Sequence, residues 1–354
     1  MFRLLALLQL TRAALAFTAI ADAWTVLLLF AGGPEKSPVY QYGKYGFWIV
    51  VLKMLLMSIV STGLYGFGMS LNDLMDMRRD RIFSPRRPLP SGRIRPRTAI
   101  VVCILLLMLS FAASAAMNAI DAAWAKEPIY MPWSVIFAFA TAILIIFYDA
   151  TAKYLGGLGL VTLGAIRALH CLIANPKTPL LFLSMFLLTH VIIVSFIAYR
   201  MEGKRPRLKR GDWIVGIIGV VVGNAAALIY MMQRHAFTMD LWPMIMGPIS
   251  AMVLYTLWAL IYLRLRRDVY TTRKKGERLM LMGLFWLFLY DAGFLFANAQ
   301  ILAGIAITVL LILAVLSFFG LRWLGRWLAL PVRYRRQVGQ YFQRVAEETG
   351  DSGR

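Results

Sequence analysis

The sequence has few cysteines and few histidines, and both shortages exclude classes of protein. Its two cysteines, Cys103 and Cys171, lie inside apolar segments, so they predict neither a disulfide framework nor a metal site. His170 and His190 also lie in apolar segments, where a hydrogen bond between helices is the simplest role. His235 falls in a loop, and we assign it no function. No polar stretch is long enough to form a separate soluble domain.

Acidic residues are scarce too, with 17 against 38 lysines and arginines, for a net charge of +21. Such a charge is typical of nucleic-acid-binding proteins. Here, however, the basic residues are spread over many short connections between apolar segments. That distribution sets the orientation of a membrane protein and also attracts anionic headgroups or a diphosphate. We therefore expect no nucleic-acid partner.

Long apolar segments are abundant, since 60% of the residues are hydrophobic and the mean hydropathy is +0.69. Runs of 17 or more apolar residues can cross a bilayer core of roughly 30 Å, so the lipid bilayer is the predicted environment. We expect the first segment to be a retained helix rather than a cleaved signal peptide. Only Asn298 separates the last two segments, which are either two spans or one span with a re-entrant neighbour. The segments lie near residues 13–31, 46–70, 98–117, 132–149, 156–174, 179–199, 213–232, 242–264, 279–297 and 299–319.

The basic residues predict a topology. The N-terminal region, the connections after even-numbered segments and the C-terminal tail hold 31 of the 38, whereas the odd connections hold 5. By the positive-inside rule, both termini and the Asn72–Ile94 connection are cytoplasmic, and an even number of spans is favoured. We predict an integral protein of a bacterial inner membrane. Residues 1–320 would form one transmembrane domain, and residues 321–354 a basic amphipathic cytosolic tail.

The connection after the second segment carries the most informative pattern. Asn72, Asp76 and Asp80 are spaced at i, i+4 and i+8, which places them on one face of a helix, about 6 Å apart along its axis. Carboxylate and carboxamide oxygens suit a hard cation such as Mg²⁺. Asp73 is one residue off this face and ranks below Asp76 and Asp80.

Two arginines, Arg86 and Arg87, follow on a loop stiffened by Pro88 and Pro90. Cationic side chains beside potential Mg²⁺ ligands at a membrane surface favour a particular kind of ligand. That ligand is a diphosphate carried by a lipid-soluble molecule.

The stretch NDLMDMRRDRIFSPRRPLPSGRI resembles the first aspartate-rich motif of the UbiA superfamily of intramembrane prenyltransferases, and LLQLTRAALAFTAIADAW resembles the opening helix of that family. The resemblance implies an all-α bundle of nine to ten transmembrane helices around a central cavity, with a cytosolic cap from the loops after the second and sixth spans. It also implies Mg²⁺-dependent transfer of a prenyl group from a polyprenyl diphosphate to a small acceptor, aromatic or another hydrophobic nucleophile. It does not indicate an oligomeric state.

A second family feature is Tyr-x-x-x-Lys at the end of the fourth span. This chain has Tyr148 and Lys153 five residues apart, with Asp149 four residues before Lys153. The variant is similar to the EboC-like branch of the superfamily. The resemblance gives Lys153 a role in holding diphosphate, and the alternative is a helix-end salt bridge to Asp149.

Arg167 lies well inside the fifth apolar segment, where an arginine costs about 2.5–3.5 kcal/mol even on lenient scales. We expect it to face the cavity or an acidic partner, with Asp22, Asp149 and Asp291 as candidates. A role in the active cavity and a purely structural ion pair are equally compatible with the sequence.

The second aspartate-rich motif of the family would follow the sixth span, and this chain departs from it. Glu202 is the only candidate acidic ligand there, because Asp212 is ten residues on and expected to begin the next span. Basic side chains could replace the charge of a second metal ion. They are Arg200, Lys204 and Arg205.

Together these patterns predict the following roles. The expected metal ligands are Asn72, Asp76, Asp80 and Glu202. The expected substrate-binding residues are Asn72, Arg86, Arg87, Lys153, Arg167 and Glu202. The expected catalytic residues are Asp76, Asp80 and Lys153. The depleted second motif leaves an alternative, a non-catalytic component that binds or exports a lipid diphosphate. A phosphoribosyl or other non-aromatic acceptor is also open, whereas the sequence pattern of a CDP-alcohol phosphotransferase is absent.

Overall fold

A computed structural model describes residues 2–29, 46–85, 87–124, 131–176, 178, 181–204, 206–233, 242–265 and 271–327 of the chain. This described part is helical, without β-strands. Eight of its helices are long and apolar enough to cross a membrane. They are α4 (Gly46–Met75), α6 (Pro96–Trp124), α7 (Trp133–Ala150), α9 (Phe182–Glu202), α10 (Arg210–Gln233), α11 (Trp242–Leu265), α12 (Thr272–Ala297) and α13 (Ile301–Trp327).

Two further apolar segments depart from a simple straight span. The first comprises α1 (Phe2–Leu10) and α2 (Ala13–Leu28), which meet at 53° and count as a ninth span if taken together. The bend is at Arg12, whose φ of 47° lies in the left-handed region and interrupts the helix. The other is α8 (Gly157–Leu172), whose 16 residues extend about 24 Å, less than a bilayer core.

All ten predicted apolar segments therefore form helices, which confirms the polytopic helical class. The last two are separate helices, because α12 ends at Ala297 and α13 begins at Ile301. The connection includes Ala299 in the left-handed region, with φ 57°. Residues 321–327 continue α13, and residues 328–354 lie outside the described residues, so the amphipathic tail stays a prediction.

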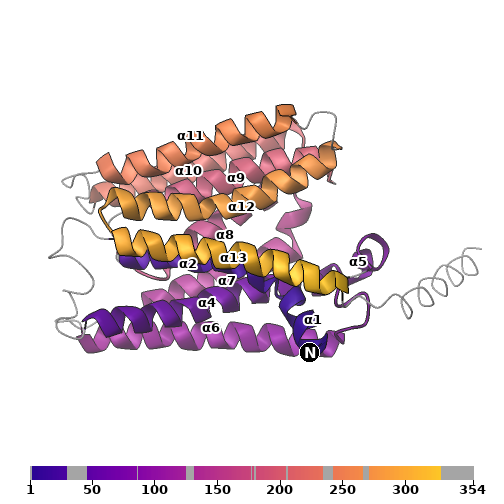
Figure 1. The fold of residues 1–354 in the computed structure, drawn as a ribbon, viewed down its shortest axis with the longest axis horizontal. Coiled ribbons are helices and arrows are strands. Elements are labelled where there is room, and N and C mark those ends of the chain that lie inside the picture. The colour runs from indigo at the N-terminus through magenta and orange to yellow at the C-terminus, as the bar shows by residue number, and fades with distance from the viewer. Residues whose placement is uncertain are drawn as a thin grey trace, which may run out of the picture.

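The charged connections gather at one end of the bundle. Figure 1 shows α1, α5 (Met77–Phe83) and the end of α13 at that end. Contacts between different connections support this placement. Lys153, after α7, pairs with Asp76, after α4, and the backbone N–H of Gly157 donates to Asp212 of α10 at 2.7 Å. Asp212 lies in the first turn of α10, as expected. The alternating arrangement of the connections follows the predicted topology, whereas the side of the membrane stays a prediction.

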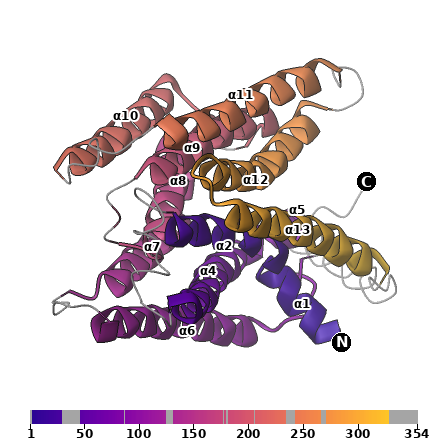
Figure 2. The same cartoon turned by 60° about the vertical axis from the view of Figure 1, so that its left-hand side comes forward.

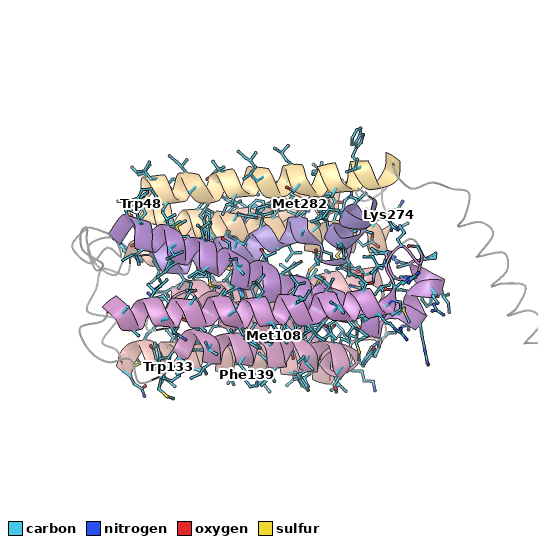
Figure 3. The ribbon with its side chains drawn as sticks, turned by 90° about the horizontal axis from the view of Figure 1, so that it is seen from below. Trp48, Met108, Trp133, Phe139, Lys274 and Met282 are labelled. Carbon is cyan, nitrogen blue, oxygen red and sulfur yellow. The ribbon has the colours of Figure 1, made fainter. Side chains whose placement is uncertain are left out.

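Helices α2, α4, α6, α7, α9 and α12 supply most of the main apolar core, whereas α10 and α11 lie toward the periphery (Figure 2). Close approach of α4 and α6 depends on Gly63. A Cβ added there would lie 2.1 Å from Ser110 Oγ and 2.7 Å from the carbonyl oxygen of Leu106. Small residues allow this kind of packing inside membranes. Large apolar side chains cover the outer surface, among them Trp48 and Met108 (Figure 3).

Candidate active site

The predicted motif lies where α4 passes into α5. The two helices are interrupted only at Asp76, and the backbone hydrogen bonds bridge the junction: Asp76 N–H donates to Asn72 at 2.9 Å and Asp80 N–H donates to Asp76 at 2.8 Å. The i, i+4, i+8 spacing therefore survives as successive helical turns. The side chains nevertheless divide into two groups, because they bind different basic side chains.

The first group surrounds Lys153, which belongs to the short 3-10 turn η3 (Ala152–Tyr154) between α7 and α8. The Lys153 ammonium donates to Asn72 Oδ1 at 3.1 Å and to Asp76 Oδ1 at 3.0 Å. It also lies 3.7 Å from Asp149 Oδ1. The helix-end salt bridge to Asp149 and the approach to the motif are thus both present.

The second group surrounds Arg87. Its Nη1 lies 2.5 Å from Asp80 Oδ2 and 3.2 Å from Asp73 Oδ1. Arg12 lies 3.7 Å from the same Asp73 oxygen. Both carboxylates are buried. Asp80 is therefore grouped with Asp73, the residue ranked lower in sequence, and not with Asn72 and Asp76.

The loop after α5 places Arg87 in this position. Ser91 Oγ donates to the Arg87 carbonyl at 2.7 Å, and Arg93 Nη1 donates to Gln9 Oε1 of α1 at 2.8 Å. The loop packs against α1 and α6 through a cluster of buried apolar residues: Ala6, Leu10, Leu89, Ile94 and Ala99. Arg86 lies outside the described residues, so its predicted role is not examined by the structure.

Glu202 lies on the last turn of α9, apart from these two groups. Its carboxylate pairs with Lys204 at 2.8 Å. A Cβ added to Gly276 of α12 would lie 3.0 Å from Glu202 Cγ, so the glutamate packs against that helix. Within the described residues, Glu202 makes no hydrogen bond or ion pair with Lys153 or Arg87. Its predicted role as a metal ligand stays a prediction.

Arg167 lies deep in the bundle, ten residues and about 15 Å along α8 from its first residue. It forms an ion pair with Asp22 of α2, one of its three predicted acidic partners. Asp291 of α12 lies within electrostatic range of both. Asp22 and Asp291 are fully buried, and several polar atoms of this group lack a hydrogen-bond partner within the described part of the chain, including both ring nitrogens of His170.

Two further polar residues inside apolar segments make contacts between helices. Lys53 pairs with Asp121 of α6 at 2.8 Å. His190 contacts Tyr290 Oη and the carbonyl oxygen of Gly283, each at 3.0 Å. Its expected role as a hydrogen bonder between helices is therefore confirmed. Both sets of contacts join helices, and neither lies at the charged end.

The donor set at the charged end suits a divalent cation. Two carboxylates and one carboxamide, from Asp76, Asp149 and Asn72, surround the ammonium nitrogen of Lys153. Oxygen ligands of this type are those that Mg²⁺ prefers. In the described chain no three histidine, cysteine or acidic side chains converge, so any such site depends on Asn72 as well as on carboxylates.

The fold and this site define a class: a polytopic helical membrane protein with carboxylates and basic side chains interleaved at one end of its bundle. Residues 37–289, more than half of the chain, match the model of the UbiA prenyltransferase family. The chain belongs to that family, which confirms the resemblance seen in its sequence.

Similar proteins of known sequence include two archaeal ones, each named digeranylgeranylglyceryl phosphate synthase. The one from Saccharolobus solfataricus is 30% identical over 123 residues, covering 34% of this chain and 39% of that protein. The one from Methanocaldococcus jannaschii is 39% identical over 72 residues, covering 20% of this chain and 25% of that protein. The chain thus matches about two fifths or less of the length of these relatives.

A similar fold occurs in a solved structure described as giving insights into the biosynthesis of digeranylgeranylglyceryl phosphate synthase in membranes. The TM-score is 0.54 at 19% sequence identity, over 83% of this chain and 99% of the other. At that identity the likeness concerns the fold alone.

Several residues of the site were not selected from the sequence. Asp73 and Arg12 share contacts with Arg87 or its partners, and Asp149 lies beside Lys153. The one available signal was local: Asp149 is four residues before Lys153, the usual spacing of a helical ion pair. Contacts between α1, α4 and the loop after α5 had no such signal.

Proposed function

We propose that this protein transfers a prenyl group from a polyprenyl diphosphate to an acceptor inside the membrane, in a reaction that requires Mg²⁺. The convergence of Asn72 and Asp76 with Lys153 is the observation that supports this most strongly. A diphosphate with its metal ion needs oxygen ligands for the metal and cations for the remaining phosphate charge. Both kinds of group occur together at the charged end of the bundle.

The proposed roles follow from charge and position. Asn72 and Asp76 hold the metal ion, which when bound supplies Lewis-acid polarisation of the phosphate oxygens. Asp80 is the third proposed ligand, and it would have to leave its ion pair with Arg87 to bind the metal. Lys153, Arg86 and Arg87 neutralise the rest of the diphosphate charge. Glu202, at the end of α9, is a further proposed ligand of the metal ion.

In the proposed reaction, the bond between C1 of the prenyl chain and the diphosphate oxygen breaks, and the diphosphate leaves with the electron pair. Lys153 and Arg87 donate hydrogen bonds to the leaving oxygens, which develop negative charge. The prenyl chain lies in a central cavity formed by the apolar helices, where water is excluded. The acceptor then attacks C1 and loses a proton.

The proposed acceptor belongs to one of two chemical classes. Aromatic and other small hydrophobic nucleophiles are one class. A lipid bearing a glyceryl phosphate is the other, because the similar archaeal proteins are named digeranylgeranylglyceryl phosphate synthases. The proposed location is a bacterial inner membrane, with the charged end of the bundle facing the cytoplasm because 31 of the 38 basic residues belong to that side.

Membranes containing the protein test the proposal when incubated with labelled farnesyl or geranylgeranyl diphosphate, Mg²⁺ and a panel of acceptors from both classes. Diphosphate release and the prenylated product, identified by mass spectrometry, are the readouts. Asp76→Asn should lower release about 10²-fold or more, in keeping with the loss of a single preorganised electrostatic group.

Glu277→Gln is a matched control, because it also removes one carboxylate charge, and the ion pair of Glu277 with Arg273 is exposed on α12. It should insert into membranes and leave release close to normal. Binding of the labelled diphosphate without release, across the whole acceptor panel, would instead support the non-catalytic alternative. Normal release from Asp76→Asn would refute the metal assignment.

A further inference from the structure

We infer that Asp149 of α7 is a further cation ligand of this site, acting with Asn72 of α4 and with Asp76 at the junction of α4 and α5. The inference rests on the proposed function, because it concerns the same Mg²⁺. It adds a residue from a different helix to the predicted ligand set. That residue would supply the second carboxylate facing Asp76.

The position of Lys153 carries the argument. Its ammonium nitrogen lies 3.1 Å from Asn72 Oδ1, 3.0 Å from Asp76 Oδ1 and 3.7 Å from Asp149 Oδ1. Three side-chain oxygens from two helices thus surround one positive charge. A place where oxygen lone pairs converge on an ammonium group is also a place where a metal cation finds its preferred ligands.

Burial makes Asp149 an unusual member of this group. Its side chain is 3% exposed, yet Oδ1 lacks a hydrogen-bond partner within the described part of the chain. A buried carboxylate is costly unless it is paired and hydrogen-bonded. Asp76, by contrast, accepts a hydrogen bond from Lys153. Asp149 Oδ1 meets the Lys153 ammonium only as an ion pair at 3.7 Å, beyond hydrogen-bond distance, so it can bind a metal cation at the position that Lys153 occupies.

Charge balance favours a divalent ion at that position. Lys153 has a flexible four-carbon stem and can turn its ammonium group toward a diphosphate. When it does so, the carboxyl groups of Asp76 and Asp149 are left with no cation between them. A divalent cation would fill that position, and Asn72 would supply a neutral third ligand.

Glu202 is less suited to this role in the geometry described. Its carboxylate is already paired with Lys204, and its stem packs against Gly276. The acidic side chain that faces Asp76 across the ammonium group comes instead from α7. The departure of the α9 segment from the expected acidic motif is thus compensated by a carboxylate from another helix.

Binding of Mn²⁺ to the purified full-length protein, measured by electron paramagnetic resonance without any prenyl diphosphate, tests this inference. The variants are Asp149→Asn and Asp76→Asn, with Glu277→Gln, which removes an exposed carboxylate, as the control. Each is also made in a Lys153→Gln background, which removes the competing ammonium group. Asp149→Asn should weaken Mn²⁺ binding about tenfold in both backgrounds, and the control should not.

Unchanged Mn²⁺ affinity of Asp149→Asn in the Lys153→Gln background would overturn the inference, because Asp149 would then serve only as a partner of Lys153. If Asp76→Asn weakens binding while Asp149→Asn does not, only the inference fails. If neither variant weakens binding, the metal assignment of the proposed function fails too. Should Asp149→Asn not fold, Asp149→Glu keeps the charge but displaces the carboxylate; severalfold weaker binding supports a ligand, and unchanged binding contradicts it.

Discussion

Replacing Arg167 by methionine should destabilise the protein strongly, because the change removes the positive charge from a buried group of three ionisable side chains. Arg167 forms an ion pair with Asp22, and Asp291 lies within electrostatic range of both. Asp22 and Asp291 have 0% exposure, so neither can be solvated by water at the protein surface. Methionine approximates the length of the arginine stem, and the packing of α8 is largely kept.

The expected cost follows from what remains after the substitution. Removing one partner of a buried ion pair costs about 3–5 kcal/mol, since the other charge is left uncompensated. Here two carboxylates are left near each other instead of one. The free energy of unfolding of Arg167→Met should therefore fall by at least about 3 kcal/mol.

A matched set of variants separates charge from packing. Asp22→Asn leaves Asp291 as a possible partner for Arg167, so its loss of stability should be smaller. The double variant Asp22→Asn with Arg167→Met restores the original net charge of the group and should recover part of the loss. The measurement is reversible unfolding in mixed detergent micelles, followed by tryptophan fluorescence, for the wild type and all three variants.

Two results would refute this reasoning. If Arg167→Met unfolds like the wild type but loses prenyl transfer, Arg167 acts on the substrate, as its predicted substrate-binding role requires. If the double variant is less stable than the wild type by the sum of the two single effects, the charges do not interact. Independent sites add in this way, whereas contacting residues do not.

Other predictions concern the site and the packing of the helices. Glu202→Gln should raise the Mg²⁺ concentration needed for diphosphate release if Glu202 holds metal, and an unchanged Mg²⁺ titration would exclude that role. Arg87→Gln should raise the KM for the prenyl diphosphate severalfold, because a cation beside Asp80 is lost; an unchanged KM in steady-state assays would contradict this. Gly63→Ala should cost about 1–3 kcal/mol, because the added methyl would overlap Ser110 on α6. Gly320→Ala, with no atom within 4 Å of the new methyl, should cause no loss of stability, because alanine also favours the helix.

The helical class was predictable because the bilayer imposes it. Within the membrane every backbone polar group must be paired internally, so an apolar segment of sufficient length becomes a helix. All ten predicted segments are helices in the structure. The shortness of α8 and the break at Arg12 were not predictable from hydropathy, because apolarity alone does not show where a helix bends or ends.

The site was predictable only along the chain. The spacing of Asn72, Asp76 and Asp80 is a local property, and the turns that carry them follow it. Their division between Lys153 and Arg87 is not local, because those cations come from a different helix end and from a folded loop. A lone sequence offers no measure of which cation lies nearest to which carboxylate.

The sequence by itself determined the membrane location, the ten helical segments, the gathering of basic connections at one end and the residue types of the site. These depend on hydrophobicity, charge and helical periodicity, which act over a few turns of one helix. The tertiary structure alone decided that Asp22 neutralises Arg167, that Asp80 joins Asp73, and that Asp149 faces Asp76 around Lys153. Only the packing of whole helices brings such pairs together, since Asp22 and Arg167 are 145 positions apart in the sequence. A buried charge without a partner is costly, and buried ion pairs therefore make this packing specific.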